Sequence, residues 1–375
     1  MQSRRTTNVT CNGSNYSERK CINLKKILFI IFFISTFLIG CSTENKLSNE
    51  APESHENLEI NVVASHLQIP WAINKFGDVF YISERKGTIV EITNGVVNRQ
   101  QVELSEQLSN ASEAGLLGFV LAPDFKQTNL AYAYYTYTHN GQSTNRIVEV
   151  ELQSDTWVEK RILVDYIPSG VVHHGGRLQI GPDGKLYATT GDAADPELAQ
   201  VQSSLAGKIL RINLDGSIPE DNPDSSSYIY SSGHRNPQGL TWTLDGKLYA
   251  TEHGNSANDE VNIIEAGANY GWPIIQGIEE KSGYVSPLFT SGRDTTWAPS
   301  GVVYYDEKLY VAALRGTALL EFDLTTNKVT KLVSNVGRIR DVWLEDNTLY
   351  FVTNNTDGRG NPSADDDQLY KLSIK

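Results

Sequence analysis

The 375-residue chain has only three cysteines, one methionine and little positive charge. All three cysteines, Cys11, Cys21 and Cys41, lie in the first 41 residues, so the rest of the chain has no thiol for a disulfide. A Cys-x-x-Cys-His motif for haem attachment is missing as well. The 45 acidic and 32 basic residues give a formal net charge of −13, which argues against nucleic-acid binding because a polyanion would be repelled.

Long hydrophobic runs are also lacking. The apolar run at 27–39 follows Lys25 and Lys26. It is short for a membrane span but has the length of a signal-peptide core. The run ends in LIGC at 38–41, which resembles a bacterial lipobox and implies that Cys41 is acylated and becomes the first mature residue. An uncleaved anchor helix is the alternative, and both interpretations place the remaining chain outside the cytoplasm.

Three segments follow from this reading. Residues 1–40 are expected to be a signal peptide whose polar extension, 1–24, precedes a translation start near Leu24. Residues 41–58 are polar and charged, as in a flexible tether between a lipid and a domain. Residues 59–375 are expected to form the folded domain. We therefore expect an exported protein that is anchored by lipid to the bacterial cell membrane.

The domain has short apolar or alternating runs separated by Gly, Asp and Asn, and no long helical periodicity, which predicts an all-β fold. One pattern recurs: a tight turn, a strand with Leu-Tyr, and a polar end. Its copies are DGKLYATTGD at 183–192, DGKLYATEHG at 245–254, DEKLYVAALRG at 306–316 and EDNTLYFVTNN at 345–355, with a weaker copy, GDVFYISERKG, at 77–87.

Repeats of about 40 to 60 residues that each contain several strands are typical of a β-propeller. We expect six blades. A sandwich would not repeat this motif, and a β-helix has a shorter period. In a propeller, equivalent strand ends from several blades converge on one central site, so the polar ends of these repeats are where chemistry is expected.

Those ends are rich in histidine, arginine and asparagine. They read VHHGGRL at 172–178, GHRNPQGL at 233–240, EHGN at 252–255, RG at 315–316 and RIRD at 338–341.

With these motifs, and with LQIPW at 67–71, GLLGF at 115–119 and SLAGKILRI at 204–212, the chain resembles the soluble quinoprotein glucose/sorbosone dehydrogenase family. The resemblance covers nearly the whole domain. It implies a six-bladed propeller that binds pyrroloquinoline quinone (PQQ) and Ca²⁺ and oxidises the C1 hydroxyl of aldose sugars to lactones.

The resemblance also implies a catalytic pair. The family's catalytic histidine stands four residues before the Arg of the Gly-Gly-Arg-Leu segment, which is His173 here, and Asp192 matches the position that orients it. Histidine suits a base that removes a hydroxyl proton near neutral pH, and a carboxylate would fix its tautomer. From the sequence alone His174 could also be the base, although a structural role is the better interpretation for it.

PQQ is a planar tricarboxylate with an ortho-quinone, so its pocket needs fixed cations and groups that polarise the quinone oxygens. Arg338 and Arg340 match the family's carboxylate-binding arginines. Arg235 and Asn236 match its Arg-Asn pair near the quinone. A lone arginine more often forms a surface ion pair, but a whole set at equivalent strand ends favours a binding role.

The chain departs from the family pattern at several positions. Arg315 stands where the family usually has a cofactor-binding lysine, which keeps the charge but changes its shape. The family's Glu-His-Gly-Pro calcium segment reads EHGN here, so Gly254 and Asn255 are the expected carbonyl ligands. Glu113 stands where some relatives have a cofactor-pocket Gln.

Two further features have open interpretations. The tail at 354–367, with the acidic run 365–367, is expected to be a solvated loop, with a cation site as the alternative. Trp272 and Trp297 could stack on the sugar or on PQQ, although aromatic residues fill the core between blades more often.

Three classes of function remain from the sequence: a PQQ-dependent aldose dehydrogenase, a calcium-dependent propeller lactonase or other hydrolase, and a noncatalytic propeller that binds sugar or protein. The first explains His173, Asp192 and the arginines together. Its expected partners are a sugar, an external electron acceptor and, through the lipid anchor, a membrane.

Overall fold

The computed structural model describes residues 53–54 and 58–374. Within them the fold is almost entirely β, with one four-residue helix, α1 (Phe125–Thr128), and one short 3-10 helix, η1 (Pro196–Gln200). No helix in this part of the chain has the length and apolar character to cross a membrane. The apolar run 27–39, Cys41 and most of the expected tether lie outside the described residues.

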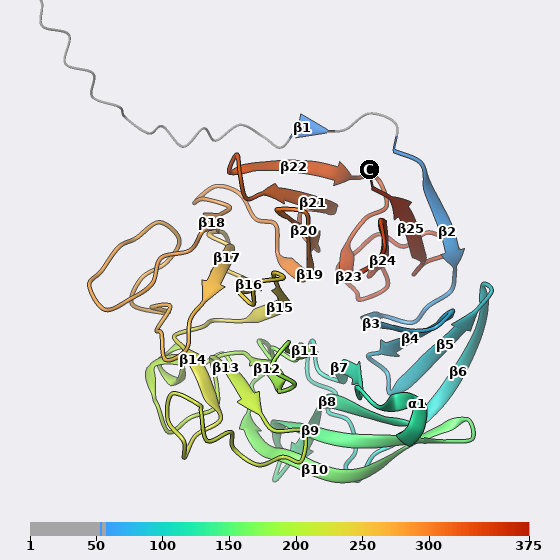
Figure 1. The fold of residues 1–375 in the computed structure, drawn as a ribbon, viewed down its shortest axis with the longest axis horizontal. Helices are drawn as coiled ribbons and strands as arrows, with labels where there is room; N and C mark the ends of the chain where they lie inside the picture. Colours follow the sequence, from blue (N-terminus) through green and yellow to red (C-terminus); the bar gives the residue numbers. More distant parts are fainter. Residues whose placement is uncertain (1–52, 55–57, 375) are drawn as a thin grey trace, which may run out of the picture. The chain divides into compact units, whose positions relative to one another are not determined.

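The described strands form five sheets, and Figure 1 shows them arranged around a central axis. The largest has eight strands, in the order β3 (Pro70–Phe76), β4 (Val79–Glu84), β5 (Thr88–Thr93), β6 (Val96–Glu103), β10 (Thr156–Pro168), β9 (Gln142–Gln153), β8 (Leu130–His139) and β7 (Leu116–Leu121). Its two halves are antiparallel meanders that join through the parallel pair β6 and β10.

The other four sheets are smaller. The first contains β11 (Leu178–Ile180), β12 (Leu186–Thr190), β13 (Lys208–Ile212) and β14 (Ile229–Ser232). The second contains β15 (Pro237–Trp242), β16 (Leu248–Glu252), β17 (Glu260–Ile264) and β18 (Phe289–Thr290). The third contains β19 (Pro299–Tyr305), β20 (Lys308–Ala313), β21 (Ala318–Asp323), β22 (Lys328–Val333) and β1 (Glu53–Ser54). The last contains β23 (Ile339–Glu345), β24 (Thr348–Thr353), β25 (Leu369–Ser373) and β2 (Ile60–Ala64).

Counted from β11, β15, β19, β23 and β3, the Leu-Tyr repeats predicted from the sequence are the second strands of their sheets. They are β12, β16, β20 and β24, and the weaker copy is β4. The Asp-Gly turns before them have left-handed backbone at Gly184 (φ 73°) and Gly246 (φ 87°), a conformation that glycine adopts without a steric penalty. The sequence prediction of equivalent strands is therefore confirmed.

The first strands pack against one another in succession around the axis: β3 with β7, β7 with β11, β11 with β15, β15 with β19, β19 with β23, and β23 with β3. The early strand β2 pairs with β25, so the last sheet contains both ends of the domain. Apolar side chains fill the space between sheets, for example Phe322 of β21, which is fully buried and packs edge to face on Phe289 of β18.

This arrangement positions the polar strand ends. In each sheet the first strand is antiparallel to the second, as β11 is to β12. The loop that leads into the first strand therefore lies beside the loop that leaves the second strand. The segments that the sequence singled out are these loops, and they meet on one face near the axis.

Candidate active site

A cavity of about 510 Å³ opens on this face. Its lining includes nine of the predicted site residues: Glu113, His173, Arg235, Asn236, Gly254, Asn255, Arg315, Arg338 and Arg340. They come from all five sheets, eight of them from loops and Arg340 from β23. The predicted Asp192 does not line the cavity and lies directly behind His173.

His173 is held between a carboxylate and a guanidinium. Its Nδ1 lies 2.7 Å from Asp192 Oδ1, and its Nε2 lies 3.0 Å from Arg235 Nη2. A guanidinium can only donate, so the imidazole proton belongs on Nδ1, where Asp192 accepts it, and Nε2 keeps its lone pair. The tautomer is therefore the one that a general base facing the cavity requires.

Asp192 is fixed by further donors. It is fully buried; Oδ1 also accepts from the Ala194 amide at 2.9 Å, and Oδ2 accepts from Trp272 Nε1 at 2.9 Å. This use of Trp272 differs from the stacking role considered from the sequence. Because each oxygen has a partner, the carboxylate has one orientation, toward His173.

The backbone explains the Gly-Asp sequence at the end of β12. A Cβ at Gly191 would lie 1.9 Å from the His173 carbonyl oxygen, so only glycine permits this approach. His173 itself has left-handed backbone, with φ 64°. Two glycines follow His174, and Gly175 donates to Asn236 Oδ1 at 3.0 Å.

His174 has the structural role that the sequence analysis favoured. It is buried, its Nδ1 lies 2.6 Å from Ser169 Oγ, and its Nε2 lies 2.8 Å from the Ser112 carbonyl oxygen. Burial lowers the pKa of His174 from its ordinary value. With both nitrogens occupied, His174 has no free atom to act as a base.

Six arginines face the cavity, Arg85, Arg235, Arg315, Arg338, Arg340 and Arg359, against two carboxylates, Glu113 and Asp259. The Asp259 carboxylate is occupied: Oδ1 accepts from the Gly254 amide, and Oδ2 accepts from the Thr296 hydroxyl and two backbone amides. The cavity is consequently a strongly cationic one.

Arg340 is the most deeply buried of these cations. Its Nη1 lies 3.1 Å from Gln238 Oε1. Among the residues that the structure describes, no carboxylate pairs with Arg340, and its buried Nε has no hydrogen-bond partner. Burial and the nearby charge of Arg338 lower the pKa of Arg340 to about 9. A buried cation without a counterion is costly, so this position favours an anion.

Arg338 is already engaged. Its Nε and Nη2 donate to Asp357 Oδ2 at 3.2 and 2.8 Å. Arg338 and Arg340 both line the cavity, and the Asp357 carboxylate beside Arg338 was not expected from the sequence. Arg315 also lines the cavity and is exposed at its rim.

The expected calcium segment forms another part of the wall. Gly254 and Asn255 follow β16, and the Gly254 bond to Asp259 fixes the loop. A Cβ at Gly254 would lie 2.1 Å from the Ala257 carbonyl oxygen, so the loop is tightly folded. In the part of the chain that the structure describes, no three His, Cys, Asp or Glu side chains form a metal cluster, so calcium here would need backbone and cofactor oxygens.

Sequence reasoning missed part of the lining, chiefly Trp71, Arg85, Gln238, His253 and Arg359. The tail prediction holds in part: residues 361–365 form an exposed loop, whereas Asp367 is fully buried and the Asp357 side chain is nearly so. Residues 356–359 follow the EDNTLYFVTNN repeat, and the rule that repeat ends converge would have found them. Trp297 is buried against Phe322 in the core rather than in the cavity lining.

The residues fit PQQ by two observations. Arg340 and Arg235 both line the cavity, and among the described residues the buried Nε of each has no hydrogen-bond partner, so each guanidinium has donor capacity to spare. The donor set also matches the group's chemistry, since guanidinium forks bind carboxylates and an amide can donate to a quinone oxygen.

Fold and site together define a β-propeller with a His-Asp pair at the edge of a cationic cavity. Comparison with known proteins gives the family: the Glucose / Sorbosone dehydrogenase family model matches residues 67–368, and the chain belongs to this family.

Two curated relatives are similar over much of the chain. Quinoprotein glucose dehydrogenase B from Acinetobacter calcoaceticus is 36% identical over 272 residues, which are 63% of this chain and 57% of that protein. An aldose sugar dehydrogenase from Escherichia coli is 29% identical over 344 residues, 80% of this chain and 91% of that protein. The match to the first relative thus spans little more than half of its length.

Among solved structures, the PQQ-bound aldose sugar dehydrogenase from Streptomyces coelicolor superimposes with a TM-score of 0.79 at 34% identity. The superposition covers 87% of this chain and all of that one. The chain is therefore related to PQQ-dependent glucose and aldose sugar dehydrogenases, which are oxidoreductases.

Proposed function

We propose that this protein is a PQQ-dependent dehydrogenase that oxidises aldose sugars at the C1 hydroxyl to lactones, with His173 as the general base. The observation that carries the proposal is the His173–Asp192 pair, joined at 2.7 Å, beside a cavity with six arginines. Such a site combines a base of fixed tautomer with a pocket for a polyanionic cofactor.

Arg340 and Arg315 would hold the carboxylates of PQQ, with Arg338 beside them, and Arg235 and Asn236 would lie at the quinone. When bound, PQQ supplies the two-electron acceptor for the hydride from the sugar carbon. Bidentate guanidinium contacts would fix the cofactor's orientation in the cavity.

His173 Nε2 accepts the proton of the sugar hydroxyl. As the imidazolium forms, Nδ1–H continues to donate to Asp192, whose charge stabilises it. In the described conformation Arg235 Nη2 lies 3.0 Å from Nε2, so this guanidinium must turn away before a hydroxyl can bind there.

Ca²⁺ is the second proposed cofactor, with the backbone carbonyls of Gly254 and Asn255 as ligands. We also propose six blades: the eight-stranded sheet counts as two, because its halves are separate meanders and the succession of first strands runs through both β3 and β7. The lipid anchor at Cys41, the export from the cytoplasm and the external electron acceptor remain proposals from the sequence.

Reconstitution of the purified chain with PQQ and Ca²⁺ tests the function, with an artificial electron acceptor and a panel of aldoses. The expected result is sugar-dependent dye reduction that needs both additions and is lost in His173→Ala. Saturable PQQ binding without turnover on any aldose would leave a binding propeller. Absence of PQQ binding would refute the assignment and favour the lactonase or the noncatalytic propeller, and a carboxylate-ligated metal would single out the lactonase.

A further inference from the structure

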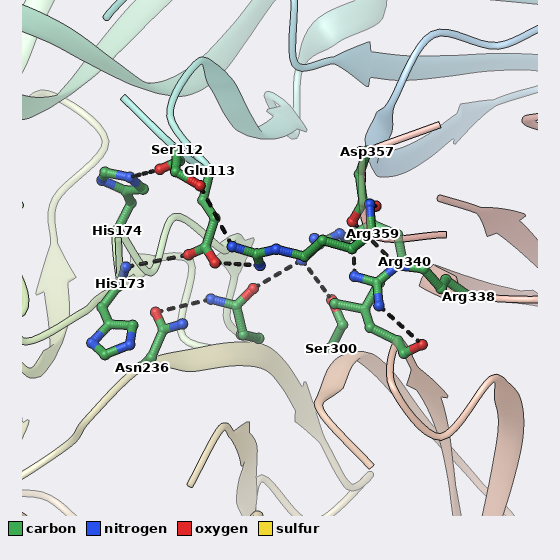
Figure 2. A network of polar contacts seen from close by, with 12 residues as sticks. Ser112, Glu113, His173, His174, Asn236, Ser300, Arg338, Arg340, Asp357 and Arg359 are labelled. Atoms are coloured by element: carbon green, nitrogen blue, oxygen red, sulfur yellow. Dashed lines mark hydrogen bonds and ion pairs between the residues drawn. The ribbon is translucent and has the colours of Figure 1, made fainter. Parts of the chain in front are cut away.

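An ion pair at the cavity mouth joins two distant parts of the chain. Arg359 Nη1, from the loop after β24, contacts Glu113 Oε1, from the loop before β7, and Arg359 Nη2 lies 3.5 Å from Ser112 Oγ. Figure 2 shows Glu113 between Arg359 on one side and His173 on the other. Both Glu113 and Arg359 line the cavity.

The second oxygen of Glu113 reaches the proposed base. Oε2 accepts from the His173 backbone amide at 3.3 Å, and the neighbouring Ser112 carbonyl accepts from His174 Nε2 at 2.8 Å. Residues 112–113 thus contact two successive residues of the histidine segment. Arg359 contacts the side chains of both Ser112 and Glu113.

The backbone conformations show why such a link is needed. Glu113 and His173 have φ values of 66° and 64°, in the left-handed region that is unfavourable for residues other than glycine. Such conformations persist only where the surroundings fix them. The Glu113 carboxylate, pulled from one side by the guanidinium and from the other by the amide, is one such restraint.

The charges agree with this reading. Burial alone would raise the pKa of Glu113, but the charge and hydrogen bond of Arg359, with the His173 amide and His253, lower it to about 2. Other ionisable groups around Glu113 are Arg85, Arg235, Arg340 and His174. Arg359, in contrast, contacts the Glu113 carboxylate directly.

We propose that Arg359 is a positioning residue of the active site: it holds the Glu113 carboxylate against the backbone amide of His173 and so fixes the base over the cavity. The proposal rests on the proposed function in that His173 is taken as the base. It assigns a role to the Asp-Gly-Arg segment at 357–359, where Asp357 binds Arg338 and Arg359 binds Glu113.

A double-mutant cycle tests it in the PQQ- and Ca²⁺-loaded protein. Arg359→Gln is expected to lower kcat by about tenfold with a smaller change in KM, and Arg359→Lys to restore part of it. In a Glu113→Gln background, Arg359→Gln should change kcat by less than about twofold, because the two residues act through one contact. A full effect in that background, or one confined to KM, would overturn the proposal in favour of direct sugar contact.

A second measurement needs no cofactor. Selective ¹⁵N-histidine labelling gives at most seven backbone amide signals, one for each histidine, and His173→Gln identifies the relevant one. In the wild type this amide should report the titration of Glu113 near pH 2. In Arg359→Gln the inflection should move up by about one to three units, the effect of one adjacent opposite charge.

The matched control is Arg161→Gln, which removes a similarly exposed arginine from a 2.7 Å pair with Glu149 away from the cavity. It should leave both kcat and the His173 amide titration unchanged. If the wild type fails to oxidise any sugar, the proposed function fails, and the amide titration alone decides the role of Arg359. An inflection that does not move in Arg359→Gln would refute it.

Discussion

Replacement of Asp192 by asparagine is the sharpest perturbation of the proposed mechanism, because it keeps the shape and removes one acceptor. The wild-type carboxylate accepts from His173 Nδ1, from Trp272 Nε1 and from the Ala194 amide. An asparagine has a single oxygen, so its NH₂ group must face either the indole or the imidazole.

Both orientations have a cost. If the NH₂ group faces His173, Nδ1 must become an acceptor, the ring proton moves to Nε2, and the base is blocked. If it faces Trp272, two donors oppose each other in a buried site. Loss of a hydrogen bond to a charged acceptor costs about 1.5 to 3 kcal/mol of stability. A loss of about 2 to 4 kcal/mol in transition-state stabilisation corresponds to about a 30- to 1000-fold lower kcat.

The assay is steady-state dye reduction by the reconstituted protein over a range of pH, with thermal unfolding measured in parallel. Asp245→Asn is the control, because Asp245 lies in the exposed turn of the neighbouring repeat. A kcat for Asp192→Asn within about threefold of the wild type, with intact cofactor binding, would refute the base-orienting role.

Three further results are expected. Arg340→Met should weaken PQQ binding by about 10- to 100-fold in a fluorescence titration, and unchanged affinity would contradict this. It should not lower the melting temperature of the cofactor-free protein, since it removes a buried cation that has no counterion among the described residues. Gly191→Ala should lower the free energy of unfolding in urea by about 3 kcal/mol, because the added Cβ meets the His173 carbonyl oxygen. The control Gly246→Ala, in an open turn, should lower it by about 1 kcal/mol. Glu113 has a pKa lowered from 4.5 to about 2, so it stabilises the fold above pH 4.5 and loses this effect as the pH falls toward 2. The difference in unfolding free energy between the wild type and Glu113→Gln should therefore shrink over that interval, and a constant difference would count against the assigned ion pair.

Much of the fold follows from local rules. The Asp-Gly turn, Leu-Tyr strand and polar end predict equivalent hairpins, and the structure makes these the second strands of successive sheets. The pairing of β2 with β25 could not be predicted, because it joins residues some 300 positions apart through backbone bonds that carry no side-chain signature. The merging of two meanders through β6 and β10 is hidden for the same reason.

The candidate site divides in a similar way. His173, Asp192 and the arginines before β15 and in β23 are found because histidine, carboxylate and guanidinium groups recur at repeat ends, and their assembly around one cavity agrees with that logic. Their chemical roles remain predictions. The acidic tail was predicted only in part, because an aspartate in a polar loop is usually solvated, as Asp365 is, whereas Asp367 is buried.

The sequence by itself determined the all-β repeat, the family resemblance and the set of residue types that could bind a quinone cofactor. Only the tertiary structure decided which of two adjacent histidines is oriented as a base by a carboxylate, since that depends on partners far along the chain: Ser112 for His174, and Asp192 and Arg235 for His173. It likewise decided that Arg359 meets Glu113 across 246 positions. Ion pairs and hydrogen bonds act over a few ångströms, so which groups interact is set where the ring of sheets brings its loops together.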